Sequence, residues 1–261
     1  KIRHNVRFSS STLLSKMRPQ SLTCSPYTTM YTLRGLVSSW RDSLEKIEMP
    51  HIHKDREYRT ILQIMQVDPV VFDLANCNAS VFTLTYLGSR ASRLVKLNLC
   101  VSRPGLTDSS ISNVLKHAPV LRFLNLSGNT NLSMRCLQGA ITKTLENLSL
   151  EGTSCVSYPK QLAPYSHQTN ITGLKVNGEA WRDEIIRKHR HSIRALNLGQ
   201  MHVTPEERSS FVFSDLSKFT CLRTLGLART DRRFLPELST QLAALPNLKE
   251  LDLSHTIWMI D

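Results

Sequence analysis

The order of apolar and polar residues repeats along most of the chain. Residues 121–129 read LRFLNLSGN, with leucine at Leu121, Leu124 and Leu126 and a polar residue at Asn129. The same spacing returns 24 residues later, where residues 145–153 read LENLSLEGT. Within each copy the last two leucines alternate with polar residues, which is the pattern of a short strand with one buried face. The sequence therefore predicts repeated units that each contain one strand.

Nine copies of this pattern fit one phase, with start-to-start distances of 22 to 29 residues. They begin at Leu44, Pro69, Leu94, Leu121, Leu145, Ile171, Ile193, Leu222 and Leu248. Six copies carry leucine or isoleucine at all three apolar positions, and those starting at Leu44, Pro69 and Ile171 are degenerate. Because single triplets are common but six in register are not, a repeat architecture is the main prediction.

Each unit is expected to form one coil. After the strand, Asn129, Thr153 and Cys77 are expected to turn inward and bond backbone groups at the bend. Helical spacing of apolar residues follows in 106–118, 214–219 and 234–245, and Asp108 is a candidate N-cap of the first of these helices. No unit can bury its own apolar face, so the units must stack. The predicted fold is an α/β solenoid of about eight to nine repeats, a horseshoe with parallel concave strands and convex helices.

The first forty-one residues differ from the rest of the chain, because they contain seven basic and no acidic residues. An acid-free start rich in arginine and serine is typical of mitochondrial targeting sequences. The alternative is a basic arm that leads into a capping helix over 30–47, where Leu33, Val37 and Trp40 share one face. Thr32, Leu33 and Val37 also fit the elongin-binding pattern of cullin-ligase receptors, although we favour the cap. The expected domains are residues 1–43, the arm and cap, and residues 44–261, the repeats.

The last copy, the apolar runs, the cysteines and the sequons add four expectations. Residues 248–256 form a full copy near the end of the sequence, so we expect further chain or a partner to cover it. Apolar runs fall far short of the ~20 residues needed to cross a bilayer. The six cysteines form no regular framework and favour buried free thiols. The five N-x-S/T sequons partly follow the repeat pattern and lend little support to secretion.

Residues 94–129 read LVKLNLCVSRPGLTDSSISNVLKHAPVLRFLNLSGN. This stretch resembles the cysteine-containing class of leucine-rich repeats found in F-box receptors and related cullin-ligase receptors. It also resembles short leucine-rich proteins that help to assemble mitochondrial membrane complexes. The residues before the repeats do not resemble an F-box, and the cysteine expected after the strand occurs only at Cys77. The resemblance therefore implies a scaffold that serves many functions.

The residue between the last two apolar positions of each copy is expected on the concave face. This row is polar and mixed in charge, which favours a protein surface or peptide as ligand, with simple solvation as the alternative. The candidate partner-binding residues are Asp73, Asn98, Asn125, Ser149, Lys175, Asn197 and Asp252.

The formal net charge of +12 favours an anionic partner. Candidate contacts to that partner are Arg187, Lys188, Arg190, Arg194, Arg232 and Arg233, which flank strands and are expected on an edge. Nucleic acid, in an RNA-rich assembly, is one possible ligand of this basic edge. A solvated charged face is the alternative, because no aromatic residues interleave for base stacking.

Catalytic patterns are missing from the sequence. The pairs His51/His53 and His189/His191 have no cysteine or carboxylate at ligand spacing, and no nucleophile elbow or phosphate-binding glycine loop occurs. We therefore expect no enzyme, cofactor or metal. The predicted function is a protein-interaction adaptor within a larger complex, in its finer form the substrate-recognition module of a cullin-type ubiquitin ligase, in the cytoplasm or nucleus. The alternative is a structural or assembly subunit of a mitochondrial or ribonucleoprotein complex.

Overall fold

The computed structural model describes residues 18–23, 28–48, 55–66, 68–77, 79–101, 106–137, 144–153, 171–175, 190–198, 213–228 and 235–255. The chain divides into two compact units, which are described separately. Unit 1 comprises Lys1–Asn125 with Arg135–Thr142, and unit 2 comprises Leu126–Met134 with Lys143–Asp261. A short 3₁₀ helix, η1 (Met134–Leu137), lies where the two ranges meet in the sequence.

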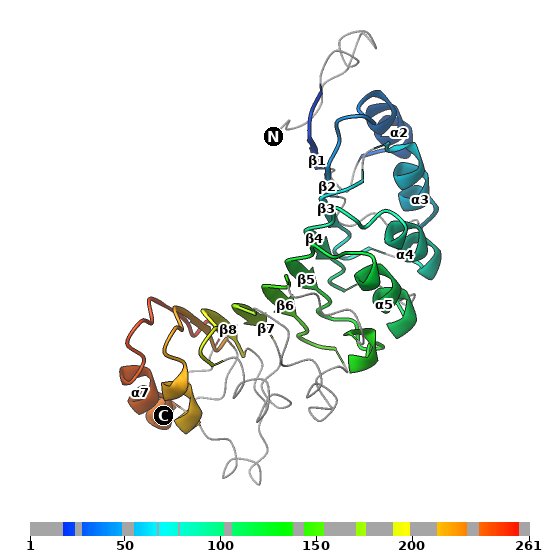
Figure 1. The fold of residues 1–261 in the computed structure, drawn as a ribbon. Helices are drawn as coiled ribbons and strands as arrows, with labels where there is room; N and C mark the ends of the chain where they lie inside the picture. Colours follow the sequence, from blue (N-terminus) through cyan, green and yellow to red (C-terminus); the bar gives the residue numbers. More distant parts are fainter. Residues whose placement is uncertain are drawn as a thin grey trace. The chain divides into compact units, whose positions relative to one another are not determined.

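Unit 1 is a row of strand-and-helix coils. Its five strands pair in parallel and in chain order, and four helices line one side of them (Figure 1). The elements are β1 (Ser21–Thr23), α2 (Met30–Ser39), β2 (Lys46–Glu48), α3 (Asp55–Ile64), β3 (Val71–Asp73), α4 (Val81–Gly88), β4 (Lys96–Asn98), α5 (Asp108–Lys116) and β5 (Phe123–Asn125).

Unit 2 has the same plan in its described residues, with parallel pairing in chain order from β6 to β10. The elements are β6 (Asn147–Ser149), β7 (Gly173–Lys175), β8 (Ala195–Asn197), η7 (Phe213–Lys218), β9 (Thr224–Gly226), α7 (Leu235–Ala243) and β10 (Glu250–Asp252). All nine predicted copies, the degenerate ones included, thus form a strand. The strand β1 is an additional one that the pattern search did not find.

Alternation along each strand places one side chain in the core. The middle residues Phe72, Leu97 and Leu124 are at most 2% exposed, and their counterparts in β6 to β9 are at most 4% exposed. In β10 the middle residue, Leu251, is 40% exposed. Burying a leucine or phenylalanine side chain stabilises a fold by roughly 1.5–3 kcal/mol, so these stacked positions supply much of the stability of the coils.

Backbone hydrogen bonds tie the start of each strand to the preceding coil. The N–H groups of Val95 and Lys96 both donate to the carbonyl oxygen of Val70, at 2.8 and 3.2 Å. The same forked arrangement occurs at the start of β2, β3, β5, β7, β8, β9 and β10. At the start of these eight strands two donors thus share one acceptor, which fixes the register between neighbouring coils.

At the other end of the strand the chain bends through a left-handed residue. The φ angles of Asn76, Val101, Gly128, Gly152 and His255 lie between 51° and 76°, and each residue stands two positions after the last apolar residue of its copy. Glycine and asparagine tolerate this conformation, whereas a β-branched residue such as Val101 is strained in it.

The predicted inward turn after the strand is confirmed. The Asn129 Nδ2 atom and the Thr153 Oγ1 atom each donate to the carbonyl oxygen three residues earlier, at 2.7 Å. The Cys77 Sγ atom donates to the carbonyl oxygen two residues earlier, at 3.3 Å. All three side chains are buried, so they satisfy backbone groups that water does not reach.

Three helical predictions need adjustment. The N-cap of α5 is Thr107, not Asp108: its side chain accepts from the N–H of Ser110 while the Ser110 hydroxyl accepts from the N–H of Thr107. The segment predicted as helical over 214–219 is the 3₁₀ helix η7. The helix predicted over 30–47 ends at Ser39, because the chain from Lys46 onward enters β2.

The cap prediction itself agrees with the burial of its apolar face. Leu33 and Val37 are 0% exposed, and Trp40 is 4% exposed. Leu33 and Val37, which also fit the elongin-binding pattern, are therefore core residues of unit 1. The boundary between residues 1–43 and 44–261 stays a prediction. The strand β1 lies within the range assigned to the arm, and it pairs with β2 of the first repeat.

The four described cysteines are free thiols, and two of them are buried as the sequence predicts. Cys77 and Cys136 are buried and Cys100 is half-buried, whereas Cys221 is exposed, contrary to expectation. Cys221 lies in the turn before its strand, one residue ahead of the buried Leu222. Among the helices that the structure describes, none combines the length and apolar character required to cross a bilayer.

Candidate protein-interaction face

The predicted concave row is aligned by the strand register. In unit 1, Glu48, Asp73, Asn98 and Asn125 are successive Cα partners at the last position of their strands. Each follows a buried residue and is half-buried, so it lies on the side of the strands opposite the core. Their role in partner binding stays a prediction.

Several members of this row are engaged within the protein. The Asp73 Oδ1 atom accepts from the N–H of Ala75 at 3.0 Å, and the Asn98 Oδ1 atom accepts from the N–H of Cys100 at 3.2 Å. In addition, the Asn98 Nδ2 atom donates to the Asp73 Oδ2 atom at 3.0 Å. The bonds to the N–H groups of Ala75 and Cys100 form Asx turns, in which the side chain stabilises the bend that follows the strand. The row therefore has an architectural role that its position alone did not suggest.

Glu48 is held by its neighbours in a different way. Its carboxylate accepts from the Thr23 hydroxyl at 2.8 Å and forms an ion pair with the Lys46 ammonium at 3.0 Å. Burial alone would raise the pKa of the Glu48 carboxyl, but the bonds from Lys46 and Thr23 outweigh it and lower the pKa below its usual value.

The corresponding row in unit 2 is also internally bonded. Ser149 shares a 2.6 Å hydrogen bond with Ser127, and Lys175 forms a 2.6 Å ion pair with Glu151. The Asp252 Oδ1 atom accepts from the N–H of Ser254 at 2.8 Å, and this bond lowers the pKa of Asp252.

Two glycines in unit 2 make room for asparagine side chains. A Cβ atom built on Gly226 would lie 2.8 Å from the Asn197 side chain, and one built on Gly173 would lie 2.0 Å from Asn147 Oδ1. In both pairs the two residues are Cα partners on adjacent strands. The asparagine side chain therefore occupies the space above the neighbouring strand that a larger residue there would fill.

Sequence reasoning missed a second row on the same face. The first residue of a strand shares its face with the third, because the side chains alternate. In unit 1 the members of this row are Ser21, Lys46, Val71, Lys96 and Phe123. Phe123 is 39% exposed, so the face carries the aromatic anchor that the other row lacks. The alternation in 121–126 carries this signal, because it places Phe123 on the same face of the strand as Asn125.

In unit 2 the row formed by the first residue of each strand has a different character. Its members are Asn147, Gly173, Ala195, Thr224 and Glu250. They are small or polar, and the Thr224 hydroxyl donates to the Glu250 carboxylate at 3.0 Å. Lysine and aromatic side chains thus occur at the first strand position in unit 1 only, as far as the ten described strands show.

The predicted basic edge is only partly visible. Arg187, Lys188, Arg232 and Arg233 lie outside the described residues, as do His51, His53 and His189. The Arg190 Nε atom donates to the His191 Nε2 atom at 3.0 Å, and the Arg194 side chain is exposed. Within the described ranges, no three histidine, cysteine or acidic side chains gather as a metal site would require.

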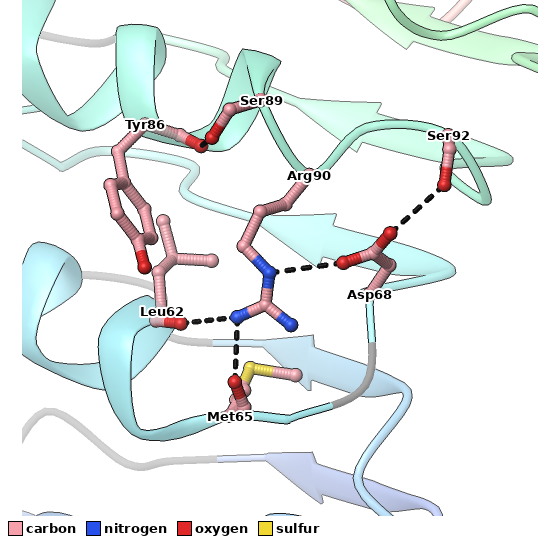
Figure 2. A network of polar contacts seen from close by, with 7 residues as sticks. All are labelled: Leu62, Met65, Asp68, Tyr86, Ser89, Arg90 and Ser92. Atoms are coloured by element: carbon pink, nitrogen blue, oxygen red, sulfur yellow. Dashed lines mark hydrogen bonds and ion pairs between the residues drawn. The ribbon is translucent and has the colours of Figure 1, made fainter.

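A separate polar network joins α3 to the segment after α4. The Arg90 guanidinium donates to the carbonyl oxygens of Leu62 and Met65 at the end of α3, the latter at 2.7 Å (Figure 2). Its Nε atom also pairs with Asp68 at 3.0 Å, and the Ser92 hydroxyl donates to the same carboxylate at 2.9 Å. These groups satisfy the orphan carbonyls at a helix end, so the network stabilises the stacking of two coils.

Two of the chains of solved structures that are similar to this chain illustrate the likeness. One, from the crystal structure of the Rad7 and Elc1 complex in yeast, has a TM-score of 0.55 and 18% identity, over 89% of this chain and 68% of that chain. The chain has the leucine-rich repeat fold. The other, from the crystal structure of a TLR13–ssRNA13 complex, has a TM-score of 0.38 and 19% identity, over 95% of this chain and 30% of that one. No family model matches the sequence, and comparison with curated proteins gives no match.

Proposed function

We propose that the protein is a non-enzymatic recognition module that binds another protein through the core-distal face of its strands. The observation that carries this proposal is the aligned strand face of unit 1. There two rows of side chains, one with exposed Phe123 and one polar, lie in register on a parallel sheet. Rigid, mixed polar and apolar surfaces with an aromatic anchor are typical of protein interfaces.

In its finer form, the proposal makes this module the substrate receptor of a cullin-type ubiquitin ligase. The resemblance of residues 94–129 to that repeat class supports it. The fold similarity to a chain from the crystal structure of the Rad7 and Elc1 complex also supports it, because that chain was crystallised together with another protein. Because Leu33 and Val37 are core residues, the site that docks the ligase would have to lie outside the buried face of α2.

The alternative is a subunit of a mitochondrial or ribonucleoprotein complex, with the acid-free first forty-one residues and the net charge of +12 in its favour. One experiment separates the two. The full-length protein is purified by affinity from its own cells, and its partners are identified by mass spectrometry. Recovery of a cullin or its adaptor supports the receptor, whereas ribosomal or respiratory subunits support the alternative. A purely monomeric protein, with no partner at natural abundance, contradicts both.

A further inference from the structure

The first-position row of unit 1 alternates between cationic and apolar side chains. In register order across β2 to β5 it consists of Lys46, Val71, Lys96 and Phe123. Neighbouring strands lie about 4.8 Å apart, so like side chains recur every ~10 Å along this row. A segment that crosses the strands therefore meets a cation, an apolar group, a second cation and an aromatic ring in turn.

Phe123 is exposed although its strand has a full core residue. The next residue, Leu124, is 2% exposed and fills the apolar position, whereas Phe123 leaves 39% of its surface in water. The phenylalanine is thus not needed to complete the core of its own coil. Val71, two strands away in the same row, is half-buried and adds a second apolar side chain to this face.

The two lysines differ in how far they are already neutralised. Lys46 is paired with Glu48 at 3.0 Å. The Lys96 side chain forms no hydrogen bond or ion pair with the described part of the chain, although its charge helps to lower the pKa of the Glu48 carboxyl. The residue two positions along its strand is the neutral Asn98. Lys96 is therefore the cation of this row that has most to gain from an anionic group.

Acidic groups beside the row select the type of ligand. Glu48 and Asp73 lie two residues along the strands that carry Lys46 and Val71. A nucleic-acid backbone carries a phosphate at every step and would be repelled by both carboxylates. A protein segment can place carboxylates over the lysines and neutral groups over Glu48 and Asp73. The overall charge of +12 also favours an acidic protein.

We propose that this row docks an acidic amphipathic segment of a partner protein, with a ligand carboxylate at Lys96 and a ligand apolar side chain against Val71 and Phe123. The proposal rests on the proposed function, in that it names the chemistry recognised by the strand face. It commits to a protein segment, and RNA is an outcome of the test.

The test uses synthetic peptides of about 15 residues, long enough as a helix to cross the row. They share their leucine and phenylalanine positions, and the remaining positions carry glutamate, glutamine or lysine. A fourth peptide keeps the glutamates but replaces the apolar residues by serine, and a single-stranded RNA is the fifth probe. Fluorescence anisotropy with the full chain measures each Kd. We expect the glutamate peptide with apolar residues to bind about tenfold or more tightly than any other probe.

Matched variants locate the binding. Lys96→Glu and Phe123→Ser are each expected to weaken binding of that peptide about tenfold. Two controls, Lys116→Glu on α5 and Phe82→Ser on α4, change the same residue types at other exposed positions and should alter the Kd less than twofold. Lys96→Glu should also bind the lysine peptide better than the wild type does. Circular dichroism melting checks that every variant is folded.

Three results would overturn the proposal: tighter binding of RNA or of the lysine peptide, equal effects of Lys96→Glu and Lys116→Glu, or no peptide binding. The natural partner separates this failure from failure of the proposed function. If the partner still binds Lys96→Glu and Phe123→Ser but is lost on Lys175→Glu, the strand face is a recognition surface and only the acidic-segment proposal is wrong. If none of these changes affects the partner, both proposals are wrong.

Discussion

Asn98 and Asp73 form a hydrogen-bonded pair that joins two coils: the Asn98 amide donates to one Asp73 carboxylate oxygen at 3.0 Å. The other carboxylate oxygen accepts from the N–H of Ala75 at 3.0 Å and stabilises the turn there. Replacing Asp73 by alanine removes both bonds and should lower the free energy of unfolding by about 1–2 kcal/mol. Asp73→Asn keeps an acceptor for the turn and should lose less. Urea denaturation followed by circular dichroism measures the difference, and equal losses for the two variants would contradict this account.

Val101 is strained by its backbone conformation. Its φ is 51° and its side chain is 44% exposed, so little packing compensates for the left-handed geometry. Val101→Asn should raise the free energy of unfolding by about 1 kcal/mol, because asparagine tolerates this region. Val120 is a matched control, since it is 41% exposed and its φ is not positive. Val120→Asn should bring no such gain in thermal melting. A destabilised Val101→Asn variant would show that the valine side chain contributes through packing instead.

Arg90 should matter far more than the neighbouring Arg93. The Arg90 side chain is 14% exposed and serves two helix-end carbonyls and Asp68, whereas Arg93 is 48% exposed and pairs with Glu45 alone. Arg90→Met should lower the free energy of unfolding by about 2–3 kcal/mol, since it leaves carbonyls and a carboxylate without their donor. Arg93→Met should cost less than ~1 kcal/mol. Hydrogen exchange at the end of α3 provides a local readout. Unchanged protection there in Arg90→Met would contradict the proposed stabilisation of the α3 end by Arg90.

Gly173 and Asn147 should show coupled effects on stability. Gly173→Ala alone places a Cβ atom 2.0 Å from Asn147 Oδ1, so the asparagine must rotate away. In an Asn147→Ala background the same change meets no obstacle and should stabilise the strand by about 0.5–1 kcal/mol. A double-mutant cycle in urea measures the coupling, which should favour the double variant over the sum of the single changes. Strict additivity would mean that the two side chains do not compete for this space.

The Glu48 carboxylate should stabilise unit 1 at neutral pH and lose this effect in acid. Its pKa in the folded protein lies below its ordinary value of 4.5, so the unfolded chain takes up the proton first as pH falls. The stabilisation is therefore complete above pH 4.5 and disappears as pH drops through the lower, folded pKa. Comparing the urea midpoints of wild type and Glu48→Gln at about pH 7 and about pH 3 tests this. The wild type should be more stable than Glu48→Gln at the higher pH, and this difference should be smaller at the lower pH.

Repetition explains how much the sequence predicts. Because the apolar spacing recurs in every copy, even Pro69 and Ile171 can be assigned from their neighbours, and the strands that follow them form as expected. The strand β1 escapes this reasoning, since the residues around Leu22 lack the full triplet and only pairing with β2 defines the strand.

Side-chain partnerships are harder to predict than strands. Spacing places Asp73 and Asn98 on the exposed face, but whether an oxygen caps its own turn or remains available to a ligand depends on rotamers. The row that contains Phe123 could be predicted from alternation, because the first residue of each strand shares the exposed face with the third. The sequence prediction included only the third residue.

The forked bonds at the strand starts also bear on how fast the protein folds. Each joins residues of adjacent repeats, whose starts are only 22 to 29 residues apart, about a tenth of the 261-residue chain. Parallel sheets usually require the chain to close long loops before their contacts form, which slows folding. Here every closure is short and nearly equal in length, so one formed coil presents a ready acceptor to the next. The parallel sheet can therefore be built by local steps, at rates closer to those of helical proteins than of other β-rich folds.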